Sequence, residues 1–298
     1  MRRMGPAALL ALLAAAAAVP WLAGPYGVTV ATSAAMWVAL TVSWSLLGGT
    51  TAYISLGHVV FYGLGAYLVA ATWGDVPLWL AILGAGGLAG AFALLVGLPV
   101  LRVKGPYFVI LTLGLAELVK HLVLNLEAGL GASSRLLFGA PGGTTLYAGM
   151  LALAVLSIAL AWWVRGSRLG RGLAAIREDE TAAETVGVPI ARFKVAAYAL
   201  SAVVPGMVGG LAALRSTYFE PTQAFSPVVS FTIVTMAIVG GSGGVAGPLM
   251  GALLLFAASE LLWASFPQVY LIGLGVLLVG FVLFVPRGLA GFLPGARP

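Results

Sequence analysis

The chain has 298 residues, of which 61% are hydrophobic and only 8% charged, and its mean hydropathy is +1.08. A soluble domain carries about 25% charged residues, so this composition excludes a water-soluble domain and indicates an integral membrane protein with several spans. The formal net charge of +6 is explained by basic residues that anchor loops at the membrane surface, and nothing suggests nucleic-acid binding. Cysteine is absent, which excludes disulfides, thiolate catalysis and Cys-ligated metals.

Apolar segments follow one another along the whole chain. A span needs roughly 20 apolar residues, and most of ten segments qualify: 6–23, 28–47, 51–72, 78–101, 106–124, 145–164, 195–214, 227–239, 245–266 and 269–285. We therefore expect an all-α protein of about ten transmembrane helices in one domain over residues 1–298. The first segment also has the pattern of a signal peptide, and we favour its retention as a span.

One of these segments, 227–239, is short. It ends in Gly240-Gly241-Ser242-Gly243-Gly244, which indicates a broken or partly inserted helix. Such a break is tolerated at membrane depth where it is buried in protein or lines a cavity.

A single long polar stretch, residues 165–194, separates two of the apolar segments. It holds six of the chain's 15 basic residues and four of its nine acidic residues. Because Lys and Arg in short loops resist translocation, we expect it on the cytoplasmic side. With both termini also cytoplasmic, ten crossings leave only Lys120, Arg135 and Arg215 of the 15 basic residues near or on the outside.

Short helices are expected within this loop. Leu169, Leu173 and Ile176 recur at helical spacing and form a narrow apolar stripe. Thr181 and Glu184 have the spacing of a capping box, and Gly187 followed by Pro189 is a helix-stop signal. The loop is either an interfacial helix that anchors the protein or a docking surface for a soluble partner, and both interpretations use the same residues.

Four stretches together resemble a known family. Residues 170–202, GRGLAAIREDETAAETVGVPIARFKVAAYALSA, are similar to the cytoplasmic loop of permease subunits of branched-chain amino-acid ABC importers, the LivM-like group. ISLGHVVFYGLGAY at 54–67, GPYFVILTLGLAE at 105–117 and VGGSGGVAGPLMG at 239–251 resemble further segments of that family in the right order. The ending Pro286-Arg287-Gly288-Leu289 also agrees with it.

The resemblance implies a division of labour among several subunits. The chain would form half of a translocation pathway with a second, LivH-like permease in the lipid bilayer. Two ABC ATPase subunits would bind and hydrolyse ATP, and an external substrate-binding protein would deliver the substrate. Because the sequence has no GxxxxGK[ST] motif, this chain is expected to be no enzyme and to carry no cofactor of its own.

The resemblance also assigns six residues to the part of the loop that couples to the ATPases: Glu178, Asp179, Glu180, Ala182, Ala183 and Gly187. Separately, four polar residues in apolar or Gly-rich segments are candidates to line the pathway: Ser55, His58, Thr112 and Ser242.

For His58, the alternative is a hydrogen bond to a neighbouring helix, and for Thr112 it is a hydrogen bond back to its own helix. Glu117 lies three and four residues before Lys120 and His121, so an intramembrane functional carboxylate and simple local pairing explain it equally well.

Other interpretations remain open from the sequence. Permeases for urea or short amides are closely similar within the family. Gly240–Gly244 satisfies GxSxG, so Ser242 with His58 or His121 could belong to an intramembrane serine protease, although the strand-to-helix context of a hydrolase is missing. A stand-alone secondary transporter would also use broken helices, but it has no evident need for the 165–194 loop.

Overall fold

The computed structural model describes residues 16, 18–129, 135–241, 244–265, 275 and 288–292. Its elements are α2 (Pro25–Trp44), α3 (Gly48–Thr51), α4 (His58–Thr72), α5 (Leu78–Val100), α6 (Pro106–Gly129), β1 (Arg135–Leu136), α7 (Gly143–Gly166), α8 (Arg168–Glu178), α9 (Glu180–Thr185), α10 (Ile190–Ala213), β2 (Tyr218–Phe219), α11 (Pro221–Ala224), α12 (Pro227–Gly240), α13 (Ala246–Ser265) and the 3-10 turn η1 (Leu289–Phe292).

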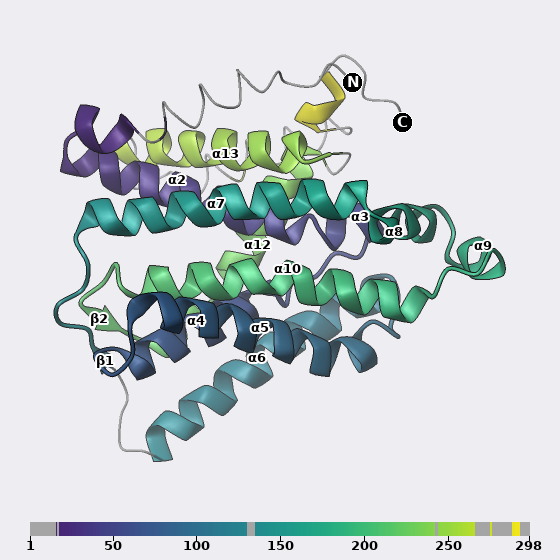
Figure 1. Ribbon diagram of the computed structural model, residues 1–298, viewed down its shortest axis with the longest axis horizontal. Helices are drawn as coiled ribbons and strands as arrows, with labels where there is room; N and C mark the ends of the chain where they lie inside the picture. Colours follow the sequence, from purple (N-terminus) through teal and green to yellow (C-terminus); the bar gives the residue numbers. More distant parts are fainter. Residues whose placement is uncertain are drawn as a thin grey trace.

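The all-α expectation is confirmed. Six helical stretches among the described residues are long and apolar enough to cross a membrane: 25–51, 78–100, 106–129, 143–166, 190–213 and 221–240. Most of the helices run side by side (Figure 1). We call the end of the bundle from which α8 and α9 project the loop end, and the opposite end, which carries β1 and β2, the strand end. Of the expected first span, 6–23, the structure describes residues 16 and 18–23, and of the expected last span, 269–285, it describes residue 275.

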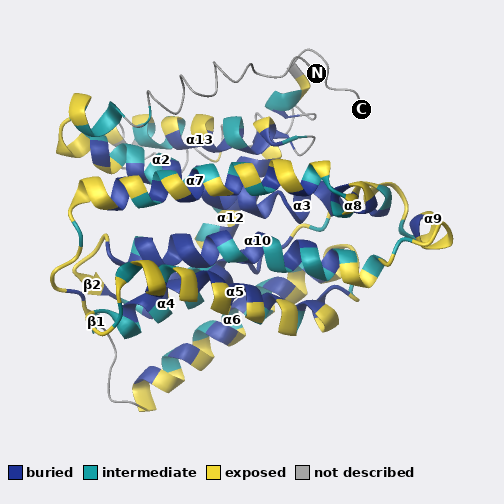
Figure 2. Cartoon of the chain, viewed as in Figure 1, coloured by how far each residue is buried: buried dark blue, intermediate teal, exposed yellow. Residues whose placement is uncertain are grey.

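Helix α10 is the centre of the bundle. Within an apolar stretch of 18 residues of this helix, 72% of the residues are buried, the largest share of any span found in the described part of the chain. It packs backbone to backbone with α4, because a Cβ on Gly65 would lie 1.9 Å from the Gly206 oxygen and one on Gly209 would lie 1.9 Å from the Tyr62 oxygen. These glycines allow the close approach that stabilises helix pairs in membranes. The buried positions in Figure 2 gather along α10 and the helix faces turned toward it.

The segment expected as one span over 51–72 is broken, which corrects the sequence prediction. Helix α3 ends at Ala52, whose φ of +61° is left-handed, and residues 52–57 run as non-helical chain until α4 begins at His58. Tyr53 in this connector lies at the loop end, whereas His58 contacts Ser201 in the middle of α10. The first turn of α4 therefore lies inside the bundle, at about half its depth.

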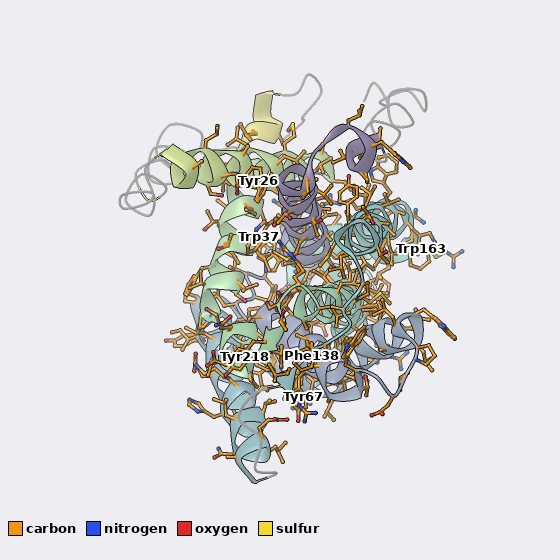
Figure 3. The ribbon with its side chains drawn as sticks, turned by 90° about the vertical axis from the view of Figure 1, so that its left-hand side faces the viewer. Tyr26, Trp37, Tyr67, Phe138, Trp163 and Tyr218 are labelled. Atoms are coloured by element: carbon orange, nitrogen blue, oxygen red, sulfur yellow. The ribbon has the colours of Figure 1, made fainter. Side chains whose placement is uncertain are left out.

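The two short strands close the strand end. Arg135 pairs with Phe219 and Leu136 with Tyr218 in an antiparallel register. Beneath them Glu127, 2% exposed, accepts hydrogen bonds from Arg135 at 2.7 Å and from the Tyr67 hydroxyl at 2.6 Å. Figure 3 looks onto this end, where Tyr67, Phe138 and Tyr218 lie near one another. A buried carboxylate shared by α6, β1 and α4 thus ties three segments together.

The expectation of a short helix at 227–239 is confirmed. Helix α12 has 14 residues and ends at Gly241, whose φ of +88° favours glycine. Gly240 and Gly251 let α12 and α13 pack closely, since a Cβ on Gly251 would lie 2.0 Å from the Met236 oxygen. Ser242 lies outside the described residues, so its proposed roles in a pathway or a protease stay predictions.

Candidate functional site

The loop at 165–194 folds into two short helices separated by one extended residue. Leu173 and Ile176 of α8 are buried and Leu169 is partly buried, which confirms the predicted apolar stripe. Helix α9 begins differently from the prediction: Asp179, not Thr181, caps it, accepting hydrogen bonds from the Thr181 and Ala182 amides at 2.7 and 3.0 Å. An extended Asp with its carboxylate over the first turn satisfies the free amides directly.

Gly187 ends α9, as the sequence predicts. Its φ is +85°, its amide donates to the Glu184 oxygen, and the Val188 amide donates to the Ala183 oxygen. This pair of bonds is a Schellman motif, which requires the left-handed conformation that glycine adopts readily.

Glu180 is the hub of the loop. Its Oε1 accepts hydrogen bonds from the Lys194 Nζ and the Tyr53 hydroxyl, each at 2.8 Å, and its Oε2 is paired with Lys104. Lys194 Nζ also donates to the Tyr53 hydroxyl at 2.9 Å and the Leu101 oxygen at 3.3 Å, and it lies 4.5 Å from the centre of the Tyr53 ring. We call Glu180, Lys194, Tyr53 and Lys104 the Glu180 clamp.

The electrostatics of the clamp favour its charged form. Burial alone would raise the pKa of Glu180, but hydrogen bonds from Lys104, Lys194 and Tyr53 outweigh it and lower the pKa to about 2. Burial and the hydrogen bond to Glu180 raise the pKa of the Tyr53 hydroxyl. The carboxylate therefore stays ionised, and the phenol stays protonated, throughout the physiological range.

The clamp joins α9 and α10, through Glu180 and Lys194, to two parts of the chain that are distant in sequence. Glu180 begins α9, Tyr53 belongs to the connector before α4, and Lys104 follows α5. A second contact reinforces the first, because Arg177 of α8 donates to the Gly49 oxygen of α3 at 2.7 Å. These contacts connect α8 and α9 directly to the segment that leads into the buried start of α4.

The other predicted loop residues have different positions. Glu178, Ala182 and Gly187 are exposed, Asp179 caps α9, and Ala183 is buried. Val186, which the sequence argument did not single out, is 77% exposed at the tip of the loop end.

Sequence reasoning missed Tyr53 and Lys104 as parts of the site. Nothing in their own neighbourhood marks them, because Tyr53 lies 127 positions before Glu180. Lys194 lies inside the predicted loop, but the sequence marks it only as one of six basic residues and not as a partner of Glu180.

The predicted pathway residues Ser55, His58 and Thr112 come together around the start of α4. His58 Nδ1 lies 3.2 Å from the Ser55 hydroxyl and Nε2 lies 3.1 Å from that of Ser201. The Thr112 hydroxyl accepts from the Leu56 amide at 3.1 Å, and that of Ser230 accepts from the Val59 amide at 3.0 Å. All five side chains are buried, so the backbone amides that the break leaves without helical partners find hydrogen-bond acceptors inside the bundle.

The family of the chain follows from comparison with known proteins. The family model for the branched-chain amino acid transport system permease component matches residues 26–285. The chain belongs to this family. A LivM permease protein of the high-affinity branched-chain amino acid transport system of Escherichia coli K12 is 30% identical over 97% of this chain and 75% of its own length. That of Salmonella typhimurium LT2 is equally similar.

Sugar permeases are more distant relatives of this branched-chain permease family member. The fructose import permease FrcC of Rhizobium meliloti is 27% identical over 66% of this chain and 59% of its own length. The ribose import permease RbsC of Haemophilus influenzae is 26% identical over 33% of this chain. No solved structure matches the chain. The resemblance noted from the motifs is thus confirmed, and the chain is a multi-pass permease component of the ABC transporter class.

Proposed function

We propose that this permease is one of two membrane-spanning subunits of an ATP-driven importer for branched-chain amino acids, in the cytoplasmic membrane of a bacterium or archaeon. Two ABC ATPases bind and hydrolyse ATP, and an external binding protein delivers the substrate. The loop end faces the cytoplasm, which agrees with the basic excess of residues 165–194. The similarity to LivM permeases, which covers 97% of this chain and 75% of their length, supports the substrate class.

The observation that carries the coupling part of the proposal is the Glu180 clamp. An importer must convert ATPase closure into movement of its spans, and an exposed loop without internal attachments would dissipate that movement. Here α9 protrudes from the bundle (Figure 1) and is fastened through Glu180 to the Tyr53 connector. ATPase closure against α9 would pull or release that connector and so shift the start of α4.

The same arrangement separates two tasks within the loop. Exposed Glu178, Ala182 and Val186 are available to an ATPase surface, whereas Glu180 faces back toward its own chain. Partner contact and transmission therefore use different residues of one short segment.

Uptake into proteoliposomes tests the proposal. The permease is co-expressed with the genes that lie next to its own, reconstituted with ATP inside or outside, and supplied with binding protein and labelled leucine, isoleucine or valine. We expect uptake that requires both ATP and the binding protein. Uptake driven by an ion gradient without ATP would refute the importer class, and ATP-driven uptake of urea or fructose alone would refute the substrate class.

A further inference from the structure

Helix α7 presents an apolar face toward the outside of the bundle. Its exposed positions recur at helical spacing on one side of the helix: Ala152, Leu156, Ala159 and Trp163. The helix carries no charged residue before Arg165 in its last turn. Because α7 is one of the helices long and apolar enough to cross a membrane, this face lies at membrane depth, where an apolar surface fits the acyl chains of lipids.

Two adjacent tryptophans end this face at the loop end. Trp162 and Trp163 are 52% and 64% exposed, one turn before α7 ends at Gly166. Figure 3 shows Trp163 at the outer edge of the bundle. Tryptophan is enriched at membrane–water boundaries, because its ring is apolar and its indole N–H can donate to headgroup oxygens. The pair therefore marks the depth at which lipid headgroups begin.

Two unpaired cations follow immediately beyond the tryptophans. Arg168 and Arg171 are exposed in the first turn of α8, three residues apart and hence on the same side of the helix. The ion pairs of the described residues all use other cations, and Arg171 donates only to the Gly166 oxygen, at 3.3 Å. The sequence has no Asp or Glu from residue 128 to residue 177, so no neighbouring carboxylate along the chain neutralises them.

Helix α8 is held against the base of the bundle, which keeps these arginines close to the tryptophans. Leu173 and Ile176, on its other side, are buried, and the helix packs on α3, α7 and α10. Its first turn is in direct contact with the end of α7, since a Cβ on Gly170 would lie 2.3 Å from the Val164 oxygen. The two guanidinium groups thus stay beside the end of a membrane-spanning helix, whereas α9 projects further from the bundle in Figure 1.

We propose that Trp162, Trp163, Arg168 and Arg171, which we call the α7–α8 edge, bind an anionic phospholipid of the cytoplasmic leaflet. The acyl chains lie along the apolar face of α7, the tryptophans contact the glycerol backbone, and the headgroup phosphate lies between the two arginines. Guanidinium groups match phosphate oxygens in charge and geometry. A basic residue this close to the membrane surface strengthens the binding of anionic lipid about fivefold. The bound lipid would hold α8, and through it α9, at a fixed height relative to the membrane.

Lipid titration followed by native mass spectrometry tests this surface. The complex, purified through a tag on this chain in a neutral detergent, is titrated with a phosphatidylglycerol and, separately, with a phosphatidylcholine that has the same acyl chains. We expect wild type to bind the phosphatidylglycerol at least about fivefold more tightly. The double variant Arg168→Gln/Arg171→Gln should bind it at least about fivefold more weakly than wild type, with phosphatidylcholine binding unchanged.

A matched double variant separates this surface from general charge. Arg102→Gln/Arg192→Gln removes the same number of charges from exposed positions near the loop end that are not part of the α7–α8 edge, and it should retain phosphatidylglycerol binding. Equal losses in the two double variants, or equal binding of the two lipids by wild type, would overturn the proposal. It would also be overturned if Arg168→Gln/Arg171→Gln lost its ATPases but kept its phosphatidylglycerol, because the arginines would then belong to a protein interface. A wild-type complex without ATPases would instead count against the proposed function alone.

Discussion

Glu180→Gln is expected to separate ATP hydrolysis from transport. The substitution keeps the size and the hydrogen-bonding oxygen of the side chain but removes the charge that holds Lys194 and Lys104. Lys194 has a side chain that is only 5% exposed, and it would be left with neutral partners alone: the amide oxygen of the new side chain, the Tyr53 hydroxyl and the Leu101 oxygen. Breaking a buried pair by removing one partner is strongly destabilising, because it leaves an uncompensated charge.

The magnitude follows from the pKa of the carboxyl. Lowering that pKa from 4.5 to about 2 corresponds to about 3 kcal/mol. Glu180 is 15% exposed and Lys104 65%, so solvent screening reduces the contribution of the clamp to about 2 kcal/mol. A loss of about 2 kcal/mol lowers the ratio of molecules in which the clamp contacts are formed to those in which they are broken about 30-fold. The α9 helix would then move without carrying the Tyr53 connector.

The assay compares two rates in the same proteoliposomes: release of phosphate and uptake of labelled leucine. For Glu180→Gln we expect uptake to fall at least tenfold while hydrolysis stays within about twofold of wild type. Glu184→Gln, an exposed carboxyl on the same helix, is the matched control and should leave both rates unchanged. Normal uptake by Glu180→Gln at normal expression would refute the transmitting role of the clamp.

Further predictions concern stability and access. Since folding lowers the pKa of Glu180, the stability that its carboxylate contributes is complete above pH 4.5 and is lost as the pH falls toward 2. Over that interval, the free energy of unfolding in detergent should fall by about 2 kcal/mol more for wild type than for Glu180→Gln. The same pH dependence in both proteins would contradict this. Gly65→Leu should cost about 3 kcal/mol or more through overpacking against α10, whereas Gly87→Leu should cost nothing, and a shared melting temperature would disprove the tight α4–α10 contact. Arg135→Ala should lower the free energy of unfolding by about 3 kcal/mol because buried Glu127 loses its counter-charge, and an unchanged melting temperature would contradict this. Ser55→Cys, in a chain without other cysteines, should resist a water-soluble maleimide in the resting complex, and rapid labelling would place it in water.

Local sequence signals predicted the parts of the fold that depend on local physics. Hydropathy located the described spans, because burial in lipid requires long apolar runs. The stripe of Leu173 and Ile176 and the stop at Gly187 were also predictable, since helix periodicity and a left-handed backbone have direct residue signatures.

Contacts between distant segments could not be predicted in this way. The break before His58 lies within a continuous apolar run, and the hydroxyls that make it tolerable come from Thr112, Ser201 and Ser230 on three other helices. The sequence predicts Glu180 only as one of six loop residues that couple to the ATPases, yet it turns toward its own chain because Lys194 and Tyr53 come within reach on folding. The N-cap of α9 is Asp179 rather than the predicted Thr181, because Asp179 is the single extended residue between α8 and α9.

Purification of the tagged permease in mild detergent, with identification of every bound protein, tests the central claim most directly. The account predicts two ATPase subunits carrying P-loops and one second permease of different sequence, with the ATPases lost when exposed Val186 and Ala182 are both replaced by Asp. A homogeneous preparation of this chain without any ATPase, from cells that also express the neighbouring genes, would contradict the importer assignment.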